Sequence, residues 1–183
     1  IIIDEGQDFK ELWFELIFSL GKNSCSQHIF MDEMQDIFGH YTKIPNEENF
    51  IKYSLPENCR NTKTIVSYLS KVLSKNIETF DNSPKGEEVV IKTFKNQTEQ
   101  QKYLIDEIKY LTIEQGISTE QILVLLNSSK AECCFGASTK VGKLEIKALD
   151  NKGRFQKDAI NYTNINTFKG LEADIVFIID TEK

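Results

Sequence analysis

The sequence lacks the long apolar run that a membrane span requires. It has 183 residues, of which 40% are hydrophobic and 27% are charged, an ordinary balance for a globular protein. No stretch approaches the ~20 apolar residues of a transmembrane helix, and the first residues do not resemble a signal peptide. These absences predict a chain without a membrane role and with a cytoplasmic location.

Cysteines are few and their spacing excludes the common cysteine scaffolds. The four are Cys25, Cys59, Cys133 and Cys134, and they match no zinc-binding pattern. Adjacent cysteines rarely bridge each other, so we expect reduced thiols, as in a cytosolic protein.

The sequence also lacks a basic excess. Its net charge is −6, and the whole imbalance lies in residues 1–53, with 4 Lys or Arg against 10 Asp or Glu. Residues 54–183 carry 18 of each sign. A broadly basic nucleic-acid surface is therefore excluded, and any contact with a phosphate backbone has to be local.

What the sequence does have is an alternation of apolar strands and amphipathic helices. The patterns predict a buried opening strand over 1–3 and a mostly buried helix over 9–20. A helix capped by Asn61 or Thr62 is expected to end near residue 75, and another helix to cover 98–115. The further predicted strands are 28–32, 89–94, 122–126, 144–149, 162–166 and 175–180. This order predicts an α/β fold with a parallel sheet.

These elements form two groups of unequal size. Residues 1–53 supply two strands and one or two helices, too little for an independent domain. Residues 54–183 supply about five strands and two good helices, enough for a compact one. We therefore expect a boundary near residues 50–56.

An acidic cluster follows the opening strand. Asp4 and Glu5 lie at the carboxyl end of the Ile-rich run, in the segment Asp4-Glu5-Gly6-Gln7-Asp8. Open α/β sheets bind ligands at this edge, where one carboxylate can hold Mg²⁺ and a second can orient a water. A solvated acidic turn is the alternative for the cluster taken alone.

Three further polar segments follow in order. They are Met31-Asp32-Glu33-Met34-Gln35-Asp36-Ile37-Phe38-Gly39, Leu55-Pro56-Glu57-Asn58-Cys59-Arg60-Asn61-Thr62 and Asn164-Ile165-Asn166-Thr167-Phe168-Lys169-Gly170-Leu171-Glu172. Taken singly, Gln35 fits a surface turn, Arg60 fits a salt bridge, and Lys169-Gly170 fits an ordinary turn.

Together, the four segments resemble motifs II, III, IV and V of the UvrD/Rep-like superfamily 1 helicases, in the same order. The resemblance implies a RecA-like parallel sheet of the P-loop NTPase type. Residues 1–53 would be the C-terminal part of the first RecA-like lobe, and residues 54–183 most of the second. The implied activity is ATP-dependent movement on single-stranded DNA.

The resemblance implies ATP and Mg²⁺ as cofactors and a role for several residues. Asp4 corresponds to the magnesium-binding acid and Glu5 to the residue that activates water, so both are implied at the metal. Gln35 corresponds to the glutamine that contacts the γ-phosphate, and Arg60 to the arginine finger. The implied catalytic residues are Glu5, Gln35 and Arg60; the implied nucleotide-binding residues are Asp4, Gln35, Arg60, Gly170 and Glu172.

The same resemblance implies single-stranded DNA as the partner. Phe38 and His40 occupy positions where the family places aromatic groups against bases. Asn166, Thr167 and Lys169 occupy the motif V positions that approach DNA. The sequence departs from the family at Cys59, where a tyrosine that stacks on adenine is common, and at Tyr41, where arginine usually follows the aromatic position.

The sequence contains neither a Gly-x4-Gly-Lys-[Ser/Thr] phosphate loop nor an arginine-bearing motif VI. We therefore expect a helicase fragment that does not hydrolyse ATP alone. The incomplete first lobe is expected to dock, form a dimer or swap strands. The alternative is a helicase-derived module that binds protein or nucleic acid without catalysis.

Overall fold

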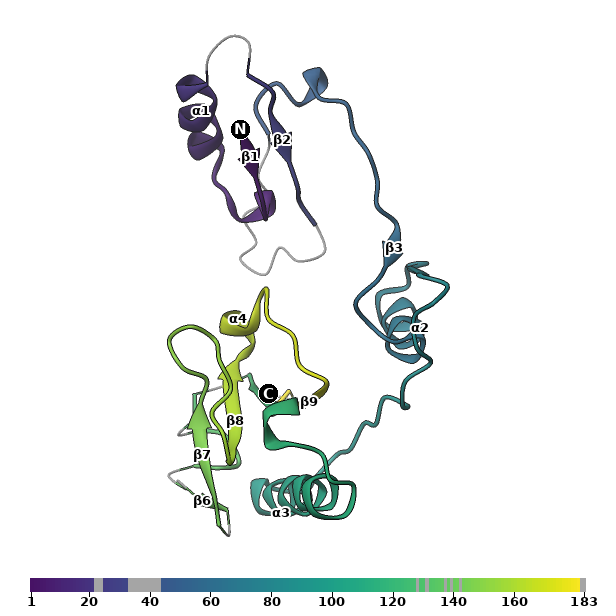
Figure 1. Cartoon of the computed structure of the whole chain (residues 1–183), viewed down its shortest axis with the longest axis vertical. Helices are drawn as coiled ribbons and strands as arrows, with labels where there is room; N and C mark the ends of the chain where they lie inside the picture. Colours follow the sequence, from purple (N-terminus) through teal and green to yellow (C-terminus); the bar gives the residue numbers. More distant parts are fainter. Residues whose placement is uncertain are drawn as a thin grey trace. The chain divides into compact units, whose positions relative to one another are not determined.

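The computed structural model describes residues 1–21, 25–32, 44–127, 129–130, 132–136, 138, 140–141 and 143–181 (Figure 1). The chain divides into two compact units, Ile1–Val89 and Val90–Lys183, and each is described by itself. The boundary predicted near residues 50–56 divides the chain between two helicase lobes, whereas the units described here are compact units of the fold. The predicted lobe boundary therefore stays a prediction. No helix among the described residues has the length and apolar character needed to cross a membrane.

The first unit begins with a two-strand parallel pair. Strand β1 (Ile2–Ile3) pairs with β2 (His28–Ile29), so the predicted opening strand is confirmed. Its predicted burial holds for Ile3, which is 4% exposed, and is wrong for Ile2, which is 74% exposed. Helix α1 (Glu11–Leu20) packs on this pair through Phe14, which is fully buried beside Ile3. The apolar contacts of this small cluster hold α1 against β1 and β2 and so position the residues that follow the two strands.

The prediction that this first helix is mostly buried is wrong. Leu12, Trp13, Leu16 and Leu20 of α1 are 50–77% exposed. The helix turns only one face toward β1 and β2, and the described residues of this unit do not cover the opposite face. The apolar composition therefore predicted the presence of the helix correctly, but it did not predict how much of the helix is buried.

The second half of this unit holds helix α2 (Lys63–Leu73), with β3 (Glu57–Asn58) parallel to β4 (Glu78–Thr79). The predicted cap is confirmed, because the Thr62 hydroxyl oxygen accepts a hydrogen bond from the Ile65 amide at 3.4 Å. Gly86 passes this cap with φ +74, and a Cβ there would lie 2.4 Å from the Thr62 side chain. Only glycine fits that approach.

The second unit is a five-stranded sheet in the order β6-β7-β8-β5-β9. Its strands are β5 (Ile122–Leu126), β6 (Lys140–Val141), β7 (Leu144–Ala148), β8 (Ala159–Asn164) and β9 (Ile175–Ile179). Every neighbouring pair is parallel except β6–β7. The predicted parallel α/β fold is confirmed.

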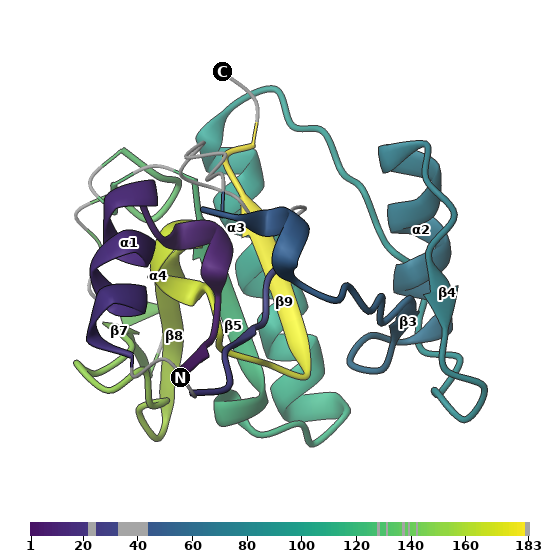
Figure 2. The same ribbon diagram turned by 90° about the horizontal axis from the view of Figure 1, so that it is seen from above.

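Helix α3 (Gln97–Lys109) lies along one face of this sheet (Figure 2). Leu104 and Ile108 of α3 pack against the face of β5 that carries Ile122, Val124 and Leu126. All five residues of β5 are buried, as expected for a strand with a neighbour on both edges and cover on both faces. The core of the unit is therefore centred on β5.

The strand predicted over residues 89–94 is wrong. This segment forms no strand, and Val89, Val90 and Ile91 are 36–67% exposed. β-Branched composition favours an extended backbone, but a strand also needs a hydrogen-bonding neighbour. The strand predicted over 162–166 is displaced toward the N-terminus, since β8 ends at Asn164 and the short helix α4 (Ile165–Phe168) follows.

The buried centre of β5 yields a stability prediction. Leu123→Ala should lower the free energy of unfolding by about 2–5 kcal/mol, because Leu123 is 0% exposed. Ile113→Ala, at a residue 77% exposed, should change it by less than about 0.5 kcal/mol. Urea denaturation followed by circular dichroism measures both, and equal losses would contradict the assigned core.

Candidate functional site

The acidic cluster lies where the sequence placed it, at the carboxyl end of β1. Asp4 is exposed and Glu5 half-buried, and Glu5 adopts a left-handed backbone with φ +53. The Gly6 amide donates to the Phe30 carbonyl at 2.8 Å, so the turn is fastened to the chain leaving β2. A Cβ on Gly6 would lie 2.9 Å from the Ile29 side chain, which explains a glycine between the acids.

Gln7 organises this cluster, although no sequence motif predicted a role for it. Its side chain is 3% exposed. The amide nitrogen donates to Glu5 Oε2 at 2.5 Å, while the amide oxygen accepts from the Asp32 backbone N–H at 2.9 Å. The one feature of the sequence that could have indicated this role is the neutral amide side chain of Gln7 in a segment of carboxylates. Gln7 thus holds the Glu5 carboxylate against the end of β2.

The donor set fits Mg²⁺ bound together with a nucleotide. Among the residues that the structure describes, no group of three or more acidic, His or Cys side chains can hold a metal unaided. Mg²⁺ in nucleotide sites usually takes one or two carboxylates and completes its shell with phosphate oxygens and water. Asp4 and Glu5 supply that number.

Arg60 follows β3 in a turn built by Asn58. Asn58 Oδ1 accepts from the backbone amides of Arg60 at 3.2 Å and Asn61 at 2.9 Å, which is the local bonding typical of Asx-turns. Arg60 and Cys59 are both exposed. The turn therefore presents the guanidinium group on the surface immediately before α2.

The motif V residues lie together on the connection from β8 to β9. Asn166 and Thr167 are exposed on α4, and Lys169 is half-buried just after it. Gly170 turns the chain with φ +79, ahead of the exposed Glu172. Because β8 ends at the carboxyl edge of the sheet, this connection begins where α/β sheets bind ligands.

A polar hollow of about 340 Å³ opens at the same edge. It lies where β5 and β8 end and is lined by Leu126, Asn127, Ser129, Glu132, Asn164, Ile165 and Asn166. Of these, only Asn166 was a sequence candidate. Asn127 and Ser129 were missed, and the available signal was their position directly after a fully buried strand. Asn127 Nδ2 donates to the Asp180 carbonyl at 3.3 Å and the Ser129 hydroxyl donates to Glu132 Oε2 at 2.9 Å, so both side chains are held in place in the wall of the hollow.

Gln35, Phe38 and His40 lie outside the described residues, so their predicted roles stay predictions. The remaining candidates fall into three groups: the acids after β1, the arginine after β3, and the motif V connection. The structure brings Asp4 and Glu5 together, and it brings Asn166, Thr167, Lys169, Gly170 and Glu172 onto one connection.

The cysteines differ sharply in environment. Cys133 and Cys134 are buried in the core of the second unit, and burial, followed by the nearby charge of Asp180, raises the pKa of Cys134 to about 12. Cys59 is exposed beside Arg60. All four cysteines are free thiols, as predicted.

The parallel sheet, with its polar connections at the carboxyl edge, has the architecture of a RecA-like helicase lobe. Comparison with known families agrees: residues 53–163 match the UvrD-like helicase C-terminal domain. The chain therefore belongs to the UvrD-like helicase family, which confirms the predicted family.

One curated relative aligns over 138 residues at 31% identity. It is named probable DNA helicase II homolog and comes from Mycoplasma capricolum subsp. capricolum. The alignment covers 68% of this chain and 19% of the relative. The chain thus spans about a fifth of that protein's length.

The two cysteine environments predict different reactivity. At about pH 8 iodoacetamide should label Cys59 rapidly and leave Cys134 unmodified, because the thiolate is the reactive form and a raised pKa suppresses it. Peptide mass spectrometry measures both rates, with urea-unfolded protein as the control in which both react. Equal labelling in the folded protein would contradict the assigned burial.

Proposed function

We propose that this chain is part of an ATP-dependent DNA helicase or translocase that moves along single-stranded DNA. The observation that carries the proposal is the pair Asp4 and Glu5 at the carboxyl end of β1, with Glu5 held by the buried Gln7. In a UvrD-like chain these are the residues that serve the nucleotide. The proposal extends the family membership to an activity.

In this proposal the chain supplies the acidic and arginine sides of a nucleotide site. Asp4 binds Mg²⁺, which neutralises charge on the phosphates of ATP. Glu5 orients the attacking water and accepts its proton, and its hydrogen bond from Gln7 limits the positions that the carboxylate can take. Arg60 stabilises negative charge on the transferred phosphoryl group.

Gly170 and Glu172 would lie beside the nucleotide, with Glu172 accepting a hydrogen bond from the ribose. Gln35 would contact the γ-phosphate and couple its loss to movement. A phosphate-binding loop has to come from outside these 183 residues, so the chain by itself is not expected to hydrolyse ATP.

Single-stranded DNA is the proposed track. Phe38 and His40 would stack on bases, a mode that tolerates any sequence. Asn166, Thr167 and Lys169 would contact the strand at the carboxyl edge of the second unit, where the polar hollow lies. A dimer or strand exchange through β1 and β2 is a further proposal, since two-residue strands leave much of their edges open.

A second candidate function is a helicase-derived module that binds without hydrolysing ATP. Cys59 favours it, because an exposed thiol stands where the family commonly has a tyrosine that stacks on adenine. The gene upstream of Ile1 distinguishes the two. A continuous frame that encodes a phosphate-binding loop supports the motor, and a start codon there supports the binding module.

The motor proposal predicts the kinetics of variants of the full-length protein. Glu5→Gln should lower DNA-stimulated ATPase kcat by about 10²–10⁴, the usual loss for a general base. Arg60→Ala should lower it by about 10³–10⁵.

The matched controls are Glu11→Gln and Lys71→Ala, which make comparable charge changes at exposed positions on α1 and α2. Both should keep wild-type kcat in a coupled phosphate-release assay. Wild-type turnover in Glu5→Gln and Arg60→Ala would refute the motor proposal.

A further inference from the structure

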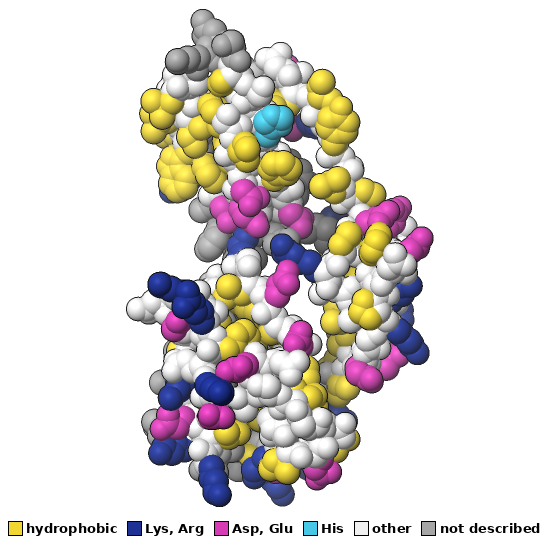
Figure 3. Space-filling model, in the orientation of Figure 1, with side chains coloured by type: hydrophobic (Ala, Val, Ile, Leu, Met, Phe, Trp, Pro, Cys, Tyr) yellow, Lys and Arg dark blue, Asp and Glu magenta, His cyan; other side chains and the backbone are white. Residues whose placement is uncertain are grey.

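One short stretch of the second unit is basic although the chain is acidic. Residues 140–157 contain six Lys or Arg and two acids, in a chain whose net charge is −6. In Figure 3 several Lys and Arg side chains lie over the region of β6, β7 and the loop that follows β7, with acidic side chains between them. A local basic surface is what contact with a phosphate backbone requires of an acidic protein.

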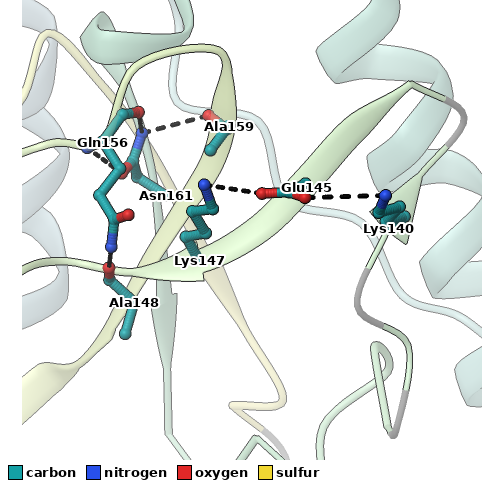
Figure 4. A network of polar contacts seen from close by, with 7 residues as sticks. All are labelled: Lys140, Glu145, Lys147, Ala148, Gln156, Ala159 and Asn161. Atoms are coloured by element: carbon teal, nitrogen blue, oxygen red, sulfur yellow. Dashed lines mark hydrogen bonds and ion pairs between the residues drawn. The ribbon is translucent and has the colours of Figure 1, made fainter.

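The basic residues of this stretch fall into two sets. Lys147 and Lys140 both pair with Glu145, at 2.6 and 3.7 Å (Figure 4). Chiefly the hydrogen bond from Lys147, helped by the charges of both lysines, lowers the pKa of Glu145. Part of their charge is therefore neutralised within the protein. Lys152 and Arg154 are exposed, and in the part of the chain that the structure describes neither forms an ion pair.

The loop that carries Lys152 and Arg154 has a fixed shape. Asp150 Oδ1 accepts from the backbone amides of Lys152 and Arg154, both at 2.8 Å, and these hydrogen bonds lower the pKa of Asp150. Gly153 between them has φ +72. The two basic side chains are thus presented from an ordered turn, which reduces the entropy that binding has to remove.

A buried asparagine anchors the far end of this loop. Asn161 of β8 is 0% exposed. Its Oδ1 accepts from the backbone N–H of Gln156 at 2.7 Å, and its Nδ2 donates to the backbone carbonyl of Gln156 at 3.0 Å. The Gln156 side chain in turn donates to the Ala148 carbonyl at 2.6 Å, so the loop is tied to both β7 and β8 (Figure 4).

The tip of the loop lies against motif V. A Cβ on Gly153 would be 3.0 Å from the Leu171 side chain, and Leu171 stands between Gly170 and Glu172. Lys152 and Arg154 therefore flank a glycine that packs on the motif V connection. The β6–β7 turn with Lys143 lies at the opposite end of β7.

We propose that Lys152 and Arg154 bind the phosphate backbone of the single-stranded DNA that passes motif V. This inference rests on the proposed function and adds two contacts to it. The Asp150 turn and the Asn161 anchor position the pair. Because they contact phosphates, they contribute affinity without sequence preference.

The test measures binding of a fluorescein-labelled oligothymidylate by the full 183-residue chain, by anisotropy over a range of salt concentrations. The double variant K152A/R154A should weaken binding about tenfold and reduce the salt slope by about 1.4, the value for two lost phosphate contacts on a single strand. The matched control K140A/K143A removes the same charge at the opposite end of β7. The control should weaken binding less than about twofold, because the two lost charges lie away from the proposed contact and salt screens their attraction for the DNA.

The outcomes separate this inference from the proposed function. Equal losses in the two double variants would overturn the inference and leave DNA binding in place. No binding by the wild-type chain at low salt would overturn the inference and leave the motor proposal to the ATPase assay of the full-length protein. A loss confined to binding of a fluorescent ATP analogue would assign the pair to nucleotide phosphate and overturn the inference as well.

A second pair of variants tests the positioning by Asp150. D150N keeps an acceptor oxygen for the two backbone amides and removes one negative charge, so it should tighten oligothymidylate binding. D150A removes the same charge and also the acceptor, so it should bind more weakly than D150N by about threefold or more. Equal affinities would show that net charge, and not the shape of the loop, controls binding, and would overturn the positioning role.

Discussion

The parallel pairing of β5 with both β8 and β9 is the constraint on which the second unit depends. Because the three strands run in the same direction, each connection has to leave at the carboxyl edge and return to the amino edge. The motif V connection from β8 and the loop after β7 therefore begin at one edge of the sheet, together with the residues that follow β5. The apolar burial of β5 thus determines where the polar residues gather.

The first unit uses the same rule with much shorter strands. Two residues each of β1 and β2 are enough to bring the turn with Glu5 near the chain that leaves β2, because the Gln7 side chain links the Glu5 carboxylate to the Asp32 backbone amide. A buried amide with both of its ends hydrogen-bonded avoids the cost of burying an unpaired polar group. The acidic cluster is therefore organised by a neutral residue.

Much of this arrangement could be predicted from the sequence, for physical reasons. Continuous apolar runs such as 122–126 and 175–179 have few alternatives to a buried strand, and Thr62 before an amphipathic pattern marks a helix start. The exposure of Leu12 and Leu16 and the unpaired state of residues 89–94 depend on which neighbours are present, and composition carries no information about that. In the same way Asp4, Glu5 and Arg60 could be chosen as candidates by motif order, whereas the surroundings of Gln7, Asn127 and Ser129 depend on tertiary contacts.

In the proposed motor, Glu5 and Arg60 act on the same phosphate. The most direct measurement is a crystal structure of the full-length protein with ADP, Mg²⁺ and aluminium fluoride, which imitates the transferred phosphoryl group. The Arg60 guanidinium should contact the fluoride, and the Glu5 carboxylate should be hydrogen-bonded to the water in line with it. A structure in which neither side chain contacts the aluminium fluoride or its water would contradict the claim.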